Sequence, residues 1–126
     1  MAEVAYTVDT NSISSSVLVK WSGLAGSDTG QWYSAGNLND VSSHCFGTFD
    51  SATVTIQGSN ESETTPTSAV TLHKVDLTSA THSSSASALQ VVETMQQYRP
   101  SVAGGGGSCS LTVIMKFVSN QRRFRE

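Results

Sequence analysis

The sequence carries little charge for its length. Of its 126 residues, 13% are Asp, Glu, Lys or Arg, about half the roughly 25% of an ordinary globular domain. Hydrophobic residues are also scarce at 37%, and Ser and Thr take much of the remaining share. The net charge of −3 gives no basic excess that would recommend nucleic acid or an anionic membrane as a partner. A surface that owes so little of its solubility to charge suits a protein covered by a partner or by other copies of itself.

Sequence signals for export and for membrane insertion are missing. The start, Met1-Ala2-Glu3, lacks the basic residues and the apolar core of a signal peptide. No apolar run approaches the ~20 residues of a membrane span. We therefore expect a protein that is kept in a cytosol or leaves the cell by a route other than secretion. A length of 126 residues predicts one domain, 1–126, whose two ends can extend as arms.

Residues for disulfide or metal chemistry are few. Two cysteines, Cys45 and Cys109, are too few for a disulfide scaffold. They would pair only if their strands are neighbours, and two small buried thiols are the simpler interpretation. His44 and Cys45 are adjacent, so on a strand they point to opposite faces and cannot hold one ion together. Because His73 and His82 add no ligand spacing, we expect neither a metal nor a cofactor.

The patterns that mark catalysis are also missing. None of the many serines lies in a Gly-x-Ser-x-Gly elbow. Glu61 and Glu63 share a polar loop, whereas an acid/base pair needs burial to separate its pKa values. The four glycines at 104–107 are followed by neither Lys-Ser/Thr nor a helix start, so they predict a hairpin turn and not a phosphate loop. We expect a protein that is not an enzyme.

What the chain does contain is the pattern of β-strands. Ala52, Val54 and Ile56 alternate with polar residues, the period of two of a strand with one buried face. A second alternating run places five apolar side chains on one face: Cys109, Leu111, Val113, Met115 and Phe117. Further strands are predicted at 4–8, 17–21, 31–34, 70–77, 89–93 and 95–99, and at 41–46 leading into the strand at 52–57. About eight short strands predict an all-β fold, a single antiparallel β-sandwich or jelly-roll-like domain.

Three segments of the chain have other interpretations. Residues 89–99 also fit one amphipathic helix, but two strands are preferred because the surroundings are β and Pro100 disfavours helix at Arg99. The Ser-rich residues 78–88 predict a loop or a short helical turn. The acidic, non-periodic residues 59–68 predict an exposed loop.

Two groups of residues are candidates for binding. Four aromatic residues are candidates for a sugar-stacking platform, although aromatics in a small β domain are more often core or interface residues: Trp21, Trp32, Tyr33 and Tyr98. The C-terminal segment is the one localised basic feature, made of Arg122, Arg123, Phe124 and Arg125. This segment could bind an acidic protein surface or nucleic acid, and an unbound, solvated chain end is an equal alternative.

Three motifs in register resemble a known family. The chain reads WSGLAGSDTG at 21–30, GTFDSATVTIQGSN at 47–60 and YRPSVAGG at 98–105. These are similar to the pattern W-x-G-L-x-x-x-D-T-G, G-T-F-x-x-A-T-V-x-x-x-G-S-N and R-P-x-V-x-G-G of small tailed-bacteriophage capsid decoration, or cement, proteins. Asp50-Ser51 stand where that family usually has Gly-Gly, and the loop after Asn60 also departs from its pattern.

The resemblance implies a non-enzymatic virion protein with a β-sandwich fold. Such a protein is assembled in the host cytoplasm, commonly as a homotrimer on the capsid surface. Its partner is the major capsid protein, whose neighbouring subunits it bridges and stabilises. From exposure and charge, the expected contacts are the two termini and the loop at 59–68, with Glu61, Glu63, Arg122, Arg123, Phe124 and Arg125. The alternatives are a carbohydrate-binding module of a tail or fibre, and a neck or head-completion protein.

Overall fold

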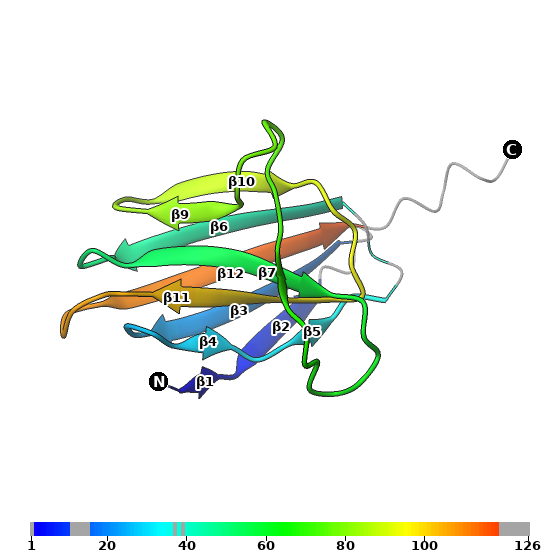
Figure 1. Cartoon of the computed structure of the whole chain (residues 1–126), viewed down its shortest axis with the longest axis horizontal. Helices are drawn as coiled ribbons and strands as arrows, with labels where there is room; N and C mark the ends of the chain where they lie inside the picture. The colour runs from blue at the N-terminus through cyan, green and yellow to red at the C-terminus, as the bar shows by residue number, and fades with distance from the viewer. Residues whose placement is uncertain (1, 11–15, 37, 39, 119–126) are drawn as a thin grey trace, which may run out of the picture.

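Two β-sheets pack face to face in the computed structural model, which describes residues 2–10, 16–36, 38 and 40–118 (Figure 1). The seven-stranded sheet contains β1 (Glu3–Val4), β4 (Thr29–Gly30), β5 (Tyr33–Ser34), β7 (Thr53–Ser59), β8 (Val70–Thr71), β9 (Thr81–Ser83) and β11 (Gln97–Ala103). The five-stranded sheet contains β2 (Tyr6–Thr10), β3 (Ser16–Leu24), β6 (Asp40–Thr48), β10 (Ser87–Val91) and β12 (Ser110–Val118). The predicted all-β sandwich is confirmed. Eight of these twelve strands have three or more residues, and the other four have two.

Strands that are distant in the sequence form the centre of each sheet. The five-stranded sheet has the order β10-β6-β12-β3-β2, and Val113 of β12 lies opposite both Cys45 and Trp21. In the other sheet β11 pairs with β7 from Gln97 opposite Ser59 to Ala103 opposite Thr53. The pairing of β1 with β4 is parallel, and the other described strand pairs are antiparallel. The arrangement therefore depends on long-range pairing more than on hairpins.

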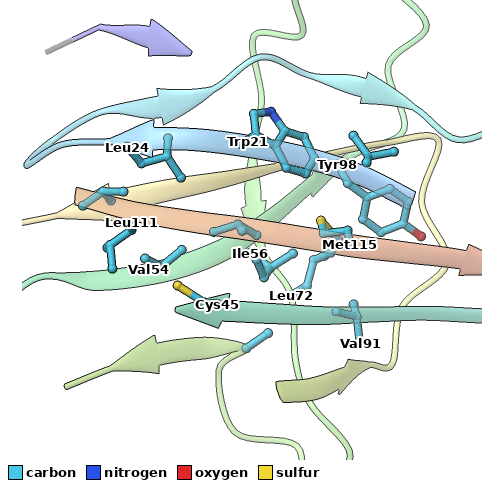
Figure 2. Packing of buried hydrophobic residues seen from close by; sticks show 14 of the residues in the cluster. Trp21, Leu24, Cys45, Val54, Ile56, Leu72, Val91, Tyr98, Leu111 and Met115 are labelled. Carbon is cyan, nitrogen blue, oxygen red and sulfur yellow. The ribbon is translucent and has the colours of Figure 1, made fainter. Parts of the chain in front are cut away.

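Alternating side chains of the facing strands make the core (Figure 2). All five residues predicted to face inward in the run that begins at Cys109 and continues through β12 are buried, and Ala52, Val54 and Ile56 are buried too. The core also takes in Trp21 of β3 and Tyr98 of β11, which are fully buried between the sheets. Both predicted buried faces are confirmed. In an alternating strand only one face can bury all the apolar side chains, because a shift by one residue would move them to the other face.

Four sequence expectations need correction. In the expected strand 70–77 only Val70–Thr71 is a strand, and the Ser-rich segment 78–88 contains β9 and the start of β10. The preference for strands over a helix at 89–99 is right, since β10 ends at Val91 and β11 begins at Gln97. The strand predicted at 52–57 runs on to Ser59, because Gly58 and Ser59 both pair with β11. The glycines at 104–107 do not close a hairpin: they cross from one sheet to the other, with Gly104 and Gly105 at positive φ.

Candidate functional site

A groove of about 350 Å³ opens where the two sheets meet beside the loop that follows β7. Glu3 of β1 and Tyr6 of β2 line one part of it, and Trp32 and Gln97 line another. Residues 62–65 of the loop complete its wall, and in Figure 1 this loop (green) swings out beside β5. The groove thus combines side chains from both sheets with an irregular segment.

Glu61 holds the loop in shape. Its carboxylate accepts hydrogen bonds from the backbone N–H of Thr67 and Ser68, at 3.1 and 2.6 Å, and from the Thr67 hydroxyl at 3.2 Å. These bonds, the Thr67 N–H first among them, lower the pKa of Glu61 below its ordinary value. Glu61 was expected to contact a partner, but its carboxylate bonds to residues of its own loop.

Glu63 occupies a different position in the same loop. Its side chain lines the groove, while its backbone carbonyl accepts a hydrogen bond of 2.7 Å from Nε2 of Gln97. The same Nε2 donates to the Glu61 carbonyl at 2.9 Å, and only 5% of Gln97 is exposed. Of the two acidic residues that sequence analysis assigned to this loop, Glu63 is the one that lines this groove.

The four aromatic residues do not form a platform. Trp21 and Tyr98 are fully buried and point into the core in Figure 2, and Tyr33 is half-buried. Trp32 is 6% exposed, and the guanidinium of Arg99 lies over its ring at 4.6 Å from the centroid. Only Trp32 of the four lines the groove, so the expected sugar-stacking surface is not assembled.

A buried serine–histidine pair went unnoticed in the sequence. Nε2 of His82 lies 2.9 Å from the Ser43 hydroxyl, and Nδ1 lies 2.7 Å from the Ser87 hydroxyl. Burial lowers the pKa of His82 to about 4, so the ring is neutral at pH 7. Because Ser43 and His82 are each 1% exposed, no substrate reaches the pair, and it joins the edges of the two sheets.

The remaining sulfur and imidazole groups are dispersed. Cys45 and Cys109 are free thiols and both are buried. His44 is exposed on the opposite face of its strand from Cys45, as expected, and His73 pairs with Glu93. Within the described ranges there is no group of three His, Cys, Asp or Glu residues that could hold a metal ion. In that part of the chain there is also no helix long and apolar enough to span a membrane.

An apolar turn projects from the molecule between β8 and β9. Val75 and Leu77 are 68% and 72% exposed, the largest exposures among the described large apolar side chains. Leu77 has a φ of +70°, and its N–H donates to the Lys74 carbonyl across the turn. We call Val75 and Leu77 the apolar tip. The segment between β8 and β9 that carries them projects beyond β10 in Figure 1. Sequence analysis had placed both residues in the strand predicted at 70–77, whereas the structure puts them in an exposed turn.

The predicted basic contact residues lie outside the described part of the chain: Arg122, Arg123, Phe124 and Arg125. Glu3, Tyr6 and Gln97 of the groove had not been singled out in the sequence. They come from three separate strands, so only the strand pairing brings them together, and no local spacing could have shown it.

The fold and the groove define the chain as an all-β sandwich with a surface groove between its two sheets. No family model matches the sequence, and no curated protein matches it. Among solved structures, the chain is similar to the SPBc2 prophage-derived protein YomS, with a TM-score of 0.61 and 12% sequence identity. The likeness covers 90% of this chain and 99% of YomS, and it shows a shared fold.

Proposed function

We propose that this protein is a non-enzymatic phage structural protein that binds the outside of the major capsid shell and stabilises it. The three sequence motifs support this proposal, as does the fold shared with a prophage-derived protein over 90% of the chain. The structural feature that most supports binding to a partner is the apolar tip, where a protein with little charge exposes two large apolar side chains. Projecting apolar side chains offer surface whose burial against a partner would be favourable.

The expected arrangement is a homotrimer that bridges neighbouring capsid subunits. Many weak contacts repeated by the symmetry of a shell give high avidity without one dominant residue. The apolar tip would enter a surface pocket of the capsid subunit, and the groove would remain for contacts between copies. Localisation on the virion surface follows from the same proposal.

Leu77→Asn tests the role of the apolar tip. Asn tolerates positive φ better than Leu, so this change should leave the free energy of unfolding unchanged or slightly raised. It should nevertheless weaken binding to purified expanded shells by about tenfold, because it removes a buried apolar contact worth roughly 1.5–3 kcal/mol. The readouts are co-sedimentation with shells and the temperature at which decorated shells break.

Val8→Thr is the matched control, since Val8 is 47% exposed on β2 and lies outside the tip. Wild-type protein that neither co-sediments with shells nor raises their heat resistance would exclude the capsid role. Copy number in the virion separates this role from a neck or head-completion protein, which is present in about a dozen copies. Light scattering tests the trimer independently of the shell.

A further inference from the structure

The groove has an acidic character. Glu3 and Glu63 line it, no Lys or Arg of the described residues does, and its other polar residues are neutral. Both contacts of Gln97 Nε2 are to carbonyl oxygens, at 2.9 and 2.7 Å, so the orientation of this amide is fixed. Its Oε1 consequently has no hydrogen-bond partner within the described ranges, although Gln97 is 95% buried and lines the groove. Where it faces the open groove, this acceptor can bond to water or to a donor of a ligand.

The aromatic side chains of the groove suit a guanidinium group. Tyr6 is half-buried in its wall, whereas Trp32 is 6% exposed and already carries the guanidinium of Arg99, which also interacts with the charge of Glu3. A guanidinium is planar, stacks on aromatic rings and carries five N–H donors with no acceptor. It therefore matches the acidic residues, the amide oxygen and the half-buried ring of Tyr6 better than a neutral ligand would.

Charge is divided unequally between the sandwich and the C-terminal segment. Residues 2–118 contain nine Asp and Glu against four Lys and Arg, a net charge of −5. Residues 119–126 contain three Arg and one Glu, a net charge of +2. We propose that the groove binds the Arg-containing segment 122–125 of a second copy of this chain, with an arginine between Glu3 and Glu63.

Strand geometry favours a second copy over the same chain. Tyr6 lies opposite Trp21, and Trp21 lies opposite Val113, five residues before Val118. The groove is thus about 17 Å back along the strands and about 10 Å across them from the end of β12. β12 ends pointing away from Tyr6, and Arg122 and Arg123 follow Val118 by only four and five residues. At about 3.3 Å per residue these spans reach about 13 and 17 Å, which is short of the roughly 20 Å to the groove.

Disulfide trapping in the full-length chain tests this inference. Thr64→Cys places a thiol on the groove wall, and Phe124→Cys places one between the arginines. Cys45 and Cys109 are buried and will not compete. Under mild oxidation we expect cross-linked dimers to form at least about tenfold faster than with Ser108→Cys and Phe124→Cys, because docking raises the effective concentration of the thiols. Ser108 is exposed and follows the far end of β11 from Gln97, so it is a matched control.

Glu63→Gln added to the trapping pair should slow cross-linking by about fivefold, whereas Asp9→Asn should leave the rate unchanged. The dimer rate should also fall with added salt. Equal rates for the two cysteine positions would overturn the groove as the site, and cross-links within one chain would overturn exchange between copies. The inference rests on the proposed self-association. Oligomers in light scattering without trapping at position 64 would leave self-association standing and reject only this site.

Discussion

At position 47 the backbone conformation and the neighbouring strand β12 accept only glycine. Its φ is +125°, and a Cβ atom there would overlap the Ser110 carbonyl oxygen and approach Leu111 Cα to 3.2 Å. Gly47→Ala should therefore lower the free energy of unfolding by about 3 kcal/mol, from backbone strain and displacement of β12. Gly107→Ala, where a Cβ meets open space, should change it by about 0.5 kcal/mol or less. Urea denaturation of both variants checks this, and equal effects would contradict it.

The departure of Asp50-Ser51 from the family pattern has a conformational consequence. Both residues have positive φ, +48° and +69°, in a turn closed by the Ala52 N–H and the Phe49 carbonyl. Two left-handed residues in succession are normally glycine, asparagine or aspartate. The Asp50 carboxylate accepts a hydrogen bond of 3.1 Å from the Ser108 N–H, and its backbone carbonyl accepts one from Gly106. These bonds help to hold a turn that glycine would adopt without strain.

The two thiols should be unreactive in the native protein. Burial is the main cause that raises the pKa of Cys45 to about 12, and it also raises the pKa of Cys109. Thiolate is the reactive species, so we expect almost no labelling by a thiol reagent at pH 8 in native buffer and two labelled thiols per chain in denaturant. Fast labelling of either cysteine before unfolding would contradict this burial.

Among the structural elements, the loop that follows β7 depends on the Glu61 carboxylate for its conformation. Glu61→Gln removes the charge that accepts the N–H groups of Thr67 and Ser68, and an amide oxygen is a weaker acceptor. We expect faster hydrogen exchange at these two amides and a smaller change elsewhere. Glu63→Gln is the matched control, because only the backbone of Glu63 bonds within the described structure. Unchanged protection at residues 67 and 68 would contradict the role of Glu61.

Elements could be predicted where the alternation was long and regular. The run from Cys109 to Phe117 fixed both the strand and its buried face, because a shift by one residue would expose five apolar side chains. The segment 78–88 gave no such signal: Ser83, Ser87 and Ala88 are exposed, and β9 and β10 form there because they pair with β7 and β6. Short edge strands of this kind depend on their neighbours more than on their own composition.

The two sheets are joined at their edge by His82, which should make the stability of the whole molecule depend on pH. Burial, followed by the nearby His44 and Lys74, lowers the pKa of His82 from 6.5 to about 4. Since the folded state disfavours the charged ring, the stabilising effect is full above pH 6.5 and is lost as the pH falls toward 4. The loss should reach about 3 kcal/mol. Urea denaturation from pH 7 to 5 measures most of it before carboxylates begin to contribute.

His82→Gln removes the titrating group and should flatten the stability profile in this pH range, at the cost of lower stability at pH 7. His44→Gln leaves His82 buried and should retain most of the slope. A wild-type profile that is flat between pH 7 and 5 would show that the ring is solvated in the folded protein.

The candidate site could be predicted only in part. The polar loop with Glu61 and Glu63 was identified from its composition, but the different roles of the two residues follow from hydrogen bonds that no sequence pattern encodes. The groove requires Glu3, Tyr6 and Gln97 to meet across two sheets. Their partners are set by the whole topology, so a reading along the chain could not place them.

The position of β12 has a consequence for how the protein is made. This strand is central in the five-stranded sheet, yet it is the last in sequence of the strands that the structure describes. During synthesis, β3 and β6 have no partner between them until residue 118 has left the ribosome, and the early chain exposes unpaired strand edges. Folding that waits for such distant pairings is slow and prone to aggregation. Functional copies should therefore accumulate only after translation is complete, and their yield should depend on chaperones and growth temperature more than that of a helical protein of equal length.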